Sequence, residues 1–272
     1  MARPVDGETA PPRGRGVALV TGAGSGLGHA TSMELLQAGF DVAMAGLDAT
    51  PAEGLPEAIP PGRRLRYYQF DLADIGTHAA LLGAVEAELG ELTCLVNNAG
   101  VTSLVRGDLL EITPASFDRC VGVNLRGTFF LSQAVARRLL SYPRHPYPPH
   151  RDALPRSIII ISSANAEIVG EDRGDYCISK AGLAMMTKLF ASRLAAHGIA
   201  VFEIRPGIIA TGMTAPASER YTRFIAAGGV PARRWGRPGD VAVAVSTLAR
   251  GEIPFSTGIH VDVGGGLQIH RV

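Results

Sequence analysis

Short runs of apolar residues alternate along the chain with longer segments of helical composition. In most of the short runs the apolar residues are consecutive rather than placed at every second position, as at 158–161. This pattern is typical of strands in a parallel sheet whose two faces are both covered by helices. It predicts seven strands, at 17–20, 42–45, 65–70, 92–96, 158–161, 200–204 and 259–263.

The segments between these strands have the composition of helices. Pro114 and Pro238 stand where a helix would begin, and proline is common at the first helical position. The alternation of strand and helix predicts a single Rossmann-type α/β domain, in which helices flank a doubly wound, seven-stranded parallel sheet. The predicted helices are 26–38, 74–90, 114–142, 175–197 and 238–250.

Two stretches that interrupt this alternation are expected to be loops on the domain. Several prolines between 50 and 63 leave room for no more than a short turn of helix. The stretch 212–236 follows a strand and carries large side chains, including Tyr221, Phe224 and Trp235. Its position and composition suit a lid that covers a substrate.

A third stretch, 142–156, is an insertion rich in proline and histidine. Its His145, His150 and Asp152 raise the alternative of a metal site. Proline holds these side chains apart without a common face, so we favour a solvated loop and predict no metal site. Residues 1–14 lack the apolar stretch of a signal peptide and are expected to form a flexible leader before the domain at 15–272.

Composition narrows the classes of partner and the compartment. The 26 Lys and Arg residues nearly balance the 25 Asp and Glu residues, which removes the electrostatic reason to expect a nucleic-acid or anionic-membrane partner. No apolar run reaches the roughly 18 residues of a membrane span. Cys94, Cys120 and Cys177 have no metal-binding spacing and are odd in number, which favours a reducing compartment, the cytoplasm.

A glycine-rich turn directly follows the first predicted strand and opens a helix. Glycine at 22, 24 and 26 lets the backbone turn tightly and approach a pyrophosphate, whose charge the free N–H groups at the helix start would stabilise. The spacing differs from the G-x-G-x-x-G dinucleotide fingerprint, and Ser25 adds no charge. A plain strand-to-helix turn is therefore the alternative to a phosphate site.

The residues after the second strand bear on the choice between NAD and NADP. A carboxylate there would bind the ribose hydroxyls of NAD, whereas a basic group would bind the extra phosphate of NADP. The turn Gly46-Leu47-Asp48 contains no basic residue, so we favour NAD(H) without excluding NADP(H), with Asp48 either a ribose ligand or an ordinary turn residue. Asp71 and Leu72 could contact an adenine edge, although helix N-capping would also explain Asp71.

The strongest candidate for chemistry is a tyrosine and a lysine four residues apart. Tyr176 and Lys180 would project from one face of a helix. A protonated lysine favours the phenolate and lowers the phenol pKa from its usual value near 10, which would make Tyr176 a general acid/base. Ser162 and Ser163 end a strand at the edge where open α/β sheets bind ligands, and a serine hydroxyl there could bind the same substrate oxygen.

Together and in this order, these motifs resemble those of a classical short-chain dehydrogenase/reductase over about residues 15–266. The separation of Ser163 from Tyr176 matches the usual spacing of that family and selects Ser163 over Ser162. The residues that carry the resemblance are Thr21 to Gly28, Asn97-Asn98-Ala99-Gly100, Asn124, Ser163, Tyr176, Lys180 and Pro206-Gly207.

The resemblance implies a catalytic tetrad of Asn124, Ser163, Tyr176 and Lys180 around a nicotinamide. Tyr176 would donate the proton in ketone reduction or accept it in alcohol oxidation, and Ser163 would position the substrate oxygen. Lys180 would hold the nicotinamide ribose and lower the tyrosine pKa, while Asn124 would organise a water chain to that lysine. Considered alone, Asn124 could equally be a helix residue whose amide is satisfied by backbone groups.

The resemblance also implies a set of cofactor contacts. Asn98 to Gly100 would line the adenosine ribose side, where a simple turn is the alternative, and the Ile209 backbone and Thr211 would meet the carboxamide and the pyrophosphate. His29 and Gly46 depart from the family pattern, which has an apolar residue and an NAD-binding aspartate there. The implied contacts are Gly22, Gly24, Ser25, Gly26, Leu27, Gly28, Asp48, Asp71, Leu72, Asn98, Ala99, Gly100, Tyr176, Lys180, Pro206, Gly207, Ile209 and Thr211.

The expected function is that of an NAD(P)-dependent oxidoreductase that interconverts a secondary alcohol and a ketone. The substrate would be a small hydroxy compound such as a polyol or a sugar derivative. A resemblance to the subgroup labelled 3-ketoacyl-acyl-carrier-protein reductase gives one alternative, and a dinucleotide-sensing protein without catalysis gives another. The residues expected to face the substrate are Ser103, Asn165, Glu167, Val169, Gly207, Met213 and Trp235.

Surface features of the predicted helices bear on partners. Arg126, Arg137 and Arg138 could meet a carrier protein, although solvated helix charges explain them as well. The segments 114–142 and 175–197 carry apolar residues on more than one face, which exceeds what one sheet contact needs. The surplus and the resemblance together predict a homotetramer, or a homodimer, that acts on a small-molecule alcohol or ketone.

Overall fold

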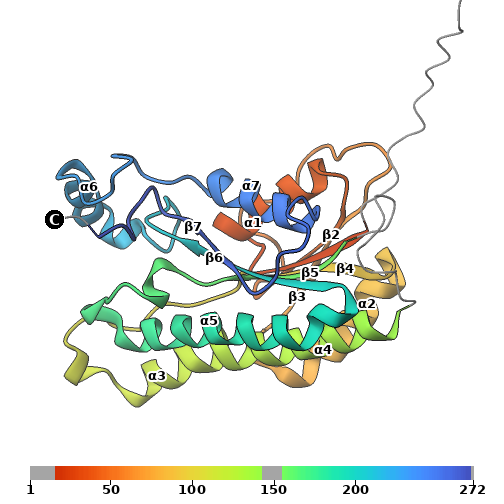
Figure 1. The fold of residues 1–272 in the computed structure, drawn as a ribbon, viewed down its shortest axis with the longest axis horizontal. Coiled ribbons are helices and arrows are strands. Elements are labelled where there is room, and N and C mark those ends of the chain that lie inside the picture. Colours follow the sequence, from red (N-terminus) through yellow and green to blue (C-terminus); the bar gives the residue numbers. More distant parts are fainter. Residues whose placement is uncertain (1–15, 143–154, 271–272) are drawn as a thin grey trace, which may run out of the picture.

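A seven-stranded, all-parallel sheet forms the centre of the protein, in agreement with the sequence prediction (Figure 1). The computed structural model describes residues 16–142 and 155–270. The strands lie in the order β3-β2-β1-β4-β5-β6-β7, so the chain starts in the middle of the sheet and builds outward in two directions. The strands are β1 (Val17–Thr21), β2 (Asp41–Gly46), β3 (Leu65–Gln69), β4 (Leu92–Asn97), β5 (Arg156–Ile161), β6 (Ile199–Pro206) and β7 (His260–Val263).

Helices cover both faces of the sheet (Figure 1). On one face lie α1 (Gly26–Gln37) and α7 (Pro238–Ala249), and on the other lie α2 (His78–Leu89), α4 (Thr128–Ser141) and α5 (Gly174–Leu194). Successive residues of a strand therefore enter different cores: Leu19 packs in one apolar cluster and Val20 in the other. This double burial is the physical reason for the consecutive apolar runs in the sequence.

The predicted helix 114–142 has three parts in the structure. An α-helix, α3 (Pro114–Cys120), leads into a π-helical turn at Val121–Gly127, and α4 continues to Ser141. Such wide turns are rare and occur mainly at functional sites. Gly127 ends the turn against the backbone of Leu72, where a Cβ atom would lie 2.5 Å from the Leu72 carbonyl oxygen. The close approach of this helix to the loop after β3 therefore depends on glycine.

The three stretches that interrupt the alternation of strand and helix in the sequence differ in the structure. Residues 50–63 contain no helix, as predicted. The stretch 212–236 contains α6 (Ser218–Ala226), which lies at the carboxyl-terminal edge of the sheet. Residues 143–154, with His145, His150 and Asp152, lie outside the described residues, as does the leader at 1–14. No helix in the described ranges is long and apolar enough to cross a membrane.

Candidate functional site

Most of the predicted site residues, with Ser163, Tyr176 and Lys180 of the predicted tetrad, line one cavity of about 420 Å³ at the carboxyl ends of the central strands. The glycine turn after β1, the ends of β4, β5 and β6, and the first two turns of α5 all contribute to its wall. Its lining consists of Gly22, Ser25, Gly26, Leu27, Asn98, Ala99, Gly100, Ile161, Ser162, Ser163, Tyr176, Lys180, Pro206, Gly207, Ile209, Thr211, Gly212, Met213 and Thr214.

Tyr176 and Lys180 lie one turn apart on α5, as their spacing predicts. The Lys180 Nζ atom is 5.6 Å from the centroid of the Tyr176 ring and donates a hydrogen bond of 3.0 Å to the carbonyl oxygen of Ile161. This bond fixes the buried ammonium against the end of β5. Burial lowers the pKa of Lys180 to about 8, because the charged form loses its hydration.

The pKa of Tyr176 runs against the sequence expectation. Burial raises the pKa of the phenol above 10, and this effect outweighs the hydrogen bond from Ser163 and the charge of Arg173, which both lower it. The spacing in the sequence shows the nearby positive charge, whereas the loss of hydration follows from the three-dimensional packing alone. In the described site Tyr176 therefore holds its proton at neutral pH, which suits a proton donor.

Asn124 is fully buried in the π-helical turn, and both the nitrogen and the oxygen of its side-chain amide form hydrogen bonds. Its Nδ2 donates to the Val101 carbonyl and to the Ser179 hydroxyl, both at 2.9 Å, and its Oδ1 accepts from the Val101 N–H at 2.7 Å. A Cβ atom at Gly100 would lie 3.3 Å from Asn124 Oδ1 and 3.5 Å from Lys180 Nζ. Glycine there leaves the space between the two side chains open.

A buried carboxylate directly before the tyrosine was missed by the sequence reasoning. Asp175 is fully buried and accepts hydrogen bonds from the hydroxyls of Ser103 and Ser116 and, at 2.8 Å, from the Tyr176 N–H. Burial pushes the pKa of Asp175 upward, but these bonds outweigh it and the pKa is lowered. Ser103 thus contacts Asp175, where the sequence reasoning expected it to face a substrate. An acidic residue at the helix start was the only signal.

The glycine turn is held by contacts that leave no room for side chains. Gly22 has a φ of +63°, and a Cβ atom on it would lie 2.7 Å from the Ala99 Cα. A Cβ atom on Gly28 would lie 2.1 Å from the Gly22 carbonyl oxygen. The Asn98 amide donates to the carbonyls of Thr21 and Gly22, at 2.9 and 3.1 Å. Apart from the Gly26 N–H, which donates to the Glu53 carboxylate, this bare backbone at a helix start fits the pyrophosphate of a dinucleotide.

Five of the predicted cofactor contacts lie outside the cavity lining. Gly28 packs beneath the turn, and Gly24 lies beside residues 51 and 52. The Asp48 side chain is exposed, and the Asp71 carboxylate accepts from the Ala73 N–H at 2.9 Å. The Leu72 side chain is buried in the core. A local turn accounts for the Asp71 side chain, and packing accounts for Gly28 and Leu72.

A carboxylate from the 50–63 segment occupies the start of α1, and the sequence reasoning gave it no role. Glu53 accepts a hydrogen bond of 2.6 Å from the Gly26 N–H, and its other oxygen lies 3.2 Å from His29 Nδ1. The Glu53 N–H in turn donates to the Gly24 carbonyl at 3.2 Å. An acidic residue in a proline-rich loop gives no sequence signal for this contact, because only the fold brings the loop to the glycine turn.

A second cavity, of about 650 Å³, begins at Ser163 and extends to α6. Asn165, Val169 and Gly207, which the sequence analysis placed toward the substrate, line it. The other candidates lie elsewhere: Met213 lines the first cavity, and Glu167 pairs with Arg205. Trp235 lines a separate hollow beside α6.

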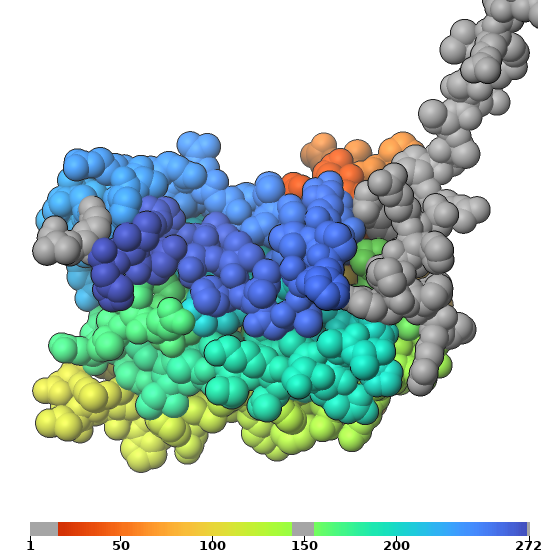
Figure 2. All heavy atoms as spheres, in the orientation of Figure 1, coloured from red at the N-terminus to blue at the C-terminus, as the bar shows by residue number. Residues whose placement is uncertain are grey.

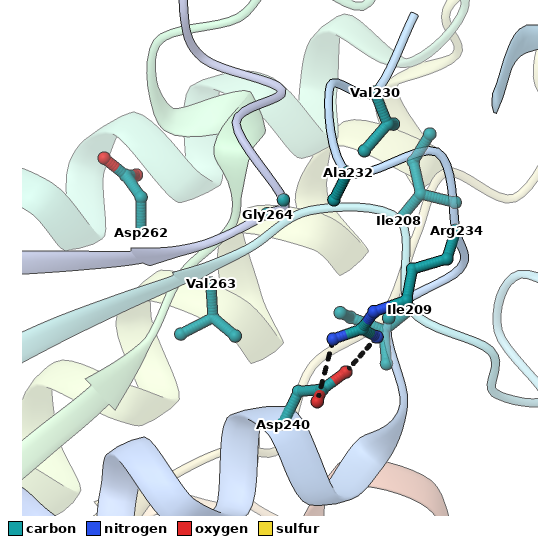
Figure 3. Close-up of a pocket in the computed structure, with 11 residues that line it drawn as sticks. Ile208, Ile209, Val230, Ala232, Arg234, Asp240, Asp262, Val263 and Gly264 are labelled. Atoms are coloured by element: carbon teal, nitrogen blue, oxygen red, sulfur yellow. Dashed lines mark hydrogen bonds and ion pairs between the residues drawn. The ribbon is translucent and has the colours of Figure 1, made fainter. Parts of the chain in front are cut away.

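A smaller hollow of about 240 Å³ is lined in part by Ile208 and Ile209, which follow β6 (Figure 3). Figure 3 shows Arg234 and Asp240 facing each other across its rim, with hydrogen bonds of 2.6 and 3.2 Å. The Gly236 N–H also donates to the Ile208 carbonyl at 2.9 Å. These contacts anchor the carboxyl end of the 212–236 stretch to α7 and to the end of β6.

Comparison with known proteins gives a consistent result. The family model described as short chain dehydrogenase matches residues 16–222. A (3R)-3-hydroxyacyl-CoA dehydrogenase of Canis lupus familiaris is 34% identical over 93% of this chain and 96% of its own. The crystal structure of a Brucella melitensis 3-oxoacyl-[acyl-carrier protein] reductase with NAD matches at a TM-score of 0.86 with 41% identity, over 96% of this chain and 100% of that one. An Agrobacterium tumefaciens structure with bound NADP matches at 0.77 with 30% identity, over 92% and 95%.

Proposed function

The chain belongs to the short-chain dehydrogenase family, and on that premise we propose that it interconverts a secondary alcohol and a ketone with Tyr176 as general acid/base. It is an oxidoreductase that acts on CH–OH groups with NAD or NADP. One observation carries the proposal: Ser163, Tyr176 and Lys180 line the same cavity as the glycine turn. A substrate oxygen placed there would lie between two hydroxyl groups and a buried ammonium.

Each residue of the tetrad has a part in ketone reduction. The bound nicotinamide supplies the hydride. The Ser163 hydroxyl donates a hydrogen bond to the ketone oxygen, and the Tyr176 phenol gives that oxygen its proton. The Lys180 ammonium stabilises the resulting phenolate, and Asn124 holds the wall of the space beside the ammonium. Alcohol oxidation follows the same steps in reverse.

Cofactor contacts complete this proposal. Lys180 would bind the nicotinamide ribose, and the Ile209 backbone and Thr211 would bind the carboxamide and the pyrophosphate, since all three line the cavity. Asp48, with Asp71 and Leu72, stays a proposed contact of the adenosine end. The 212–236 stretch would serve as the lid.

We expect NAD to be preferred over NADP. The segment 46–54 contains no lysine or arginine, and Glu53 places a carboxylate on the Gly26 N–H. The extra phosphate of NADP would find no cation in this segment and would be repelled by the Glu53 carboxylate. NADH should therefore bind at least about tenfold more tightly than NADPH in a fluorescence titration. Glu53→Gln should narrow that gap, and Glu57→Gln, which changes an exposed carboxylate elsewhere in the 50–63 stretch, should leave it unchanged. Equal affinities in the native protein would contradict the preference.

The reaction should respond to pH in opposite senses in its two directions. Reduction needs the protonated phenol, and burial keeps the Tyr176 pKa above its usual value, so kcat/KM for reduction should be flat near neutral pH. It should fall as the pH rises through about 8, where Lys180 loses its charge. Oxidation needs the phenolate and should rise from neutral pH. The test is to measure initial rates in both directions between pH 6 and 10, which is roughly the range in which Lys180 and Tyr176 would titrate. A reduction rate that climbs with pH would contradict this prediction.

The proposed homotetramer, or homodimer, rests on one exposed face of α5. Some of the apolar residues in excess of what a sheet contact was expected to need, including Leu131 and Leu183, are buried in the core. Packing against the sheet therefore accounts for these residues. Met185 and Leu189 stay 55% and 57% exposed. Leu189→Glu should therefore lower the mass measured by light scattering, whereas Leu55→Glu, on an exposed leucine elsewhere, should not. An identical mass for both variants would argue against this interface.

A substrate survey tests the function as a whole. NADH and NADPH binding would be measured first, followed by turnover of small ketones, sugar-derived alcohols and acetoacetyl thioesters. Activity on the thioesters alone would favour the acyl-carrier-protein reductase alternative, for which Arg126 and Arg137 are the candidate contacts, since Arg138 pairs with Glu86. Tight NADH binding without any turnover would favour the dinucleotide sensor. We also propose a cytoplasmic location, on the basis of the free cysteines.

A further inference from the structure

Two arginines meet at one tyrosine hydroxyl at the outer end of the second cavity. Arg173 donates a hydrogen bond of 2.9 Å to the Tyr221 hydroxyl, and Arg106 approaches the same oxygen at 3.4 Å. Arg220 stacks over the Tyr221 ring at 5.3 Å. Arg173, Arg220 and Tyr221 line the cavity whose inner end is Ser163. Three parts of the chain, 101–111, 164–173 and α6, build this end of the molecule (Figure 2).

Positive charge exceeds negative charge in this cluster. Asp172 lies 3.0 Å from Arg220 and 3.7 Å from Arg173, and it is shared between them. Glu171 also lines the cavity, so three arginines face two carboxylates. Within the described residues Arg106 forms no ion pair, and the buried Arg173 Nε has no hydrogen-bond partner. A neutral phenol is thus the shared acceptor of two guanidinium groups.

The wall between this cluster and Ser163 is largely apolar. Ile168, Val169, Phe224 and Leu267 line it. A short carbon chain could pack there while its ends reach Ser163 and the arginines. This division into a reacting end, an apolar middle and a cationic end is the arrangement expected for an amphipathic small molecule.

We propose that the substrate carries an anionic oxygen group, a carboxylate or a phosphate, which Arg173 and Tyr221 bind at the outer end of this cavity. Arg106 adds charge from behind Tyr221. The planar guanidinium suits either anion, because both offer paired oxygens. The assignment rests on the proposed function for the reacting end, and the anion site itself stands on the contacts around Tyr221.

The single tryptophan gives a direct readout of this site. Trp235 lies 5.9 Å from the Tyr221 ring, centroid to centroid, and its indole N–H donates to the Thr222 hydroxyl at 3.2 Å. Titration of the full chain with levulinate and with dihydroxyacetone phosphate should give a saturable change in tryptophan fluorescence. Methyl levulinate and dihydroxyacetone, which match them without the charge, should give none at the same concentrations. Comparison of the two anions distinguishes a carboxylate site from a phosphate site.

Variants separate the anion site from general surface charge. Arg173→Gln should weaken binding of the anion at least about tenfold, because a charge-assisted contact is lost, while NADH affinity stays unchanged. Arg223→Gln is the matched control, since Arg223 lies on α6, the helix that carries Tyr221, with its side chain 76% exposed. A uniform loss in both variants would overturn the assignment, as would equal fluorescence changes with the neutral partners.

Turnover of the same four compounds distinguishes failure of this inference from failure of the proposed function. A kcat/KM at least about tenfold higher for a charged compound than for its neutral partner supports the anion site. Turnover of the neutral compounds at the same rate overturns the anion site and leaves the oxidoreductase intact. Saturable anion binding without turnover of any compound, despite NADH binding, supports the site and counts against the proposed reaction.

Discussion

Tyr176→Phe should abolish nearly all turnover and leave NADH binding intact. The substitution removes one oxygen from a ring that projects from α5 into the cavity wall, so the fold has no reason to change. The lost group is the proton donor, and positioned acid/base groups contribute about 100- to 10,000-fold to a rate. The measurement is kcat/KM on a confirmed substrate, beside an NADH titration of the same preparation.

The matched control is Tyr67→Phe. Tyr67 hydrogen-bonds the Asp48 carbonyl through its hydroxyl and lies outside the cavity lining. This variant removes the same atom from a tyrosine on β3 and should keep most of the activity. Wild-type turnover in Tyr176→Phe would show that the proton comes from another group, and loss of NADH binding would show that the phenol has a cofactor role instead.

Gly28→Ala should destroy cofactor binding and destabilise the domain. The added Cβ atom would lie 2.1 Å from the Gly22 carbonyl oxygen and 2.5 Å from the Asn98 amide nitrogen. Backbone must therefore move, and overpacking of this kind costs about 1–3 kcal/mol of folding free energy. Because the displaced atoms belong to the glycine turn, NADH affinity should fall by at least about tenfold.

Gly83→Ala is the control for this effect. Gly83 lies on α2, and a Cβ atom there would meet no atom within 4 Å. Alanine at a helix interior is favoured over glycine by about 0.5–1 kcal/mol, so this variant should be as stable as the native protein or more so. Thermal unfolding and NADH titration of both variants decide the question. Native affinity in Gly28→Ala would refute the packing argument.

The fold was predictable because its signals are local and repeated. Consecutive apolar residues at 17–20 and 158–161 report burial on both faces, and the structure places both runs in the middle of the sheet. The π-helical turn around Asn124 was not predictable. Its residues are compatible with an ordinary helix, and the residues that Asn124 contacts in the structure, Val101 and Ser179, lie far from it in the sequence, so no local pattern reports these contacts.

The candidate site was predictable where spacing along one element sets the geometry. Tyr176 and Lys180 share a helix face whatever surrounds them. The pKa of Tyr176 depends instead on burial by distant segments, and the expected direction was wrong for that reason. The contact of Glu53 with Gly26 spans 27 positions and joins a loop to a helix start, so no local pattern reports it.

The position of β1 has a consequence for the order in which the protein can assemble. This strand is made early, yet its pairing with β4 joins Val20 to Val96, so it must wait for a much later part of the polypeptide to leave the ribosome. Until then one edge of a strand whose first four residues are apolar stays unpaired, which is the condition that invites aggregation. Nascent chains arrested before residue 92 should therefore depend on chaperones, whereas chains released after β6 should not.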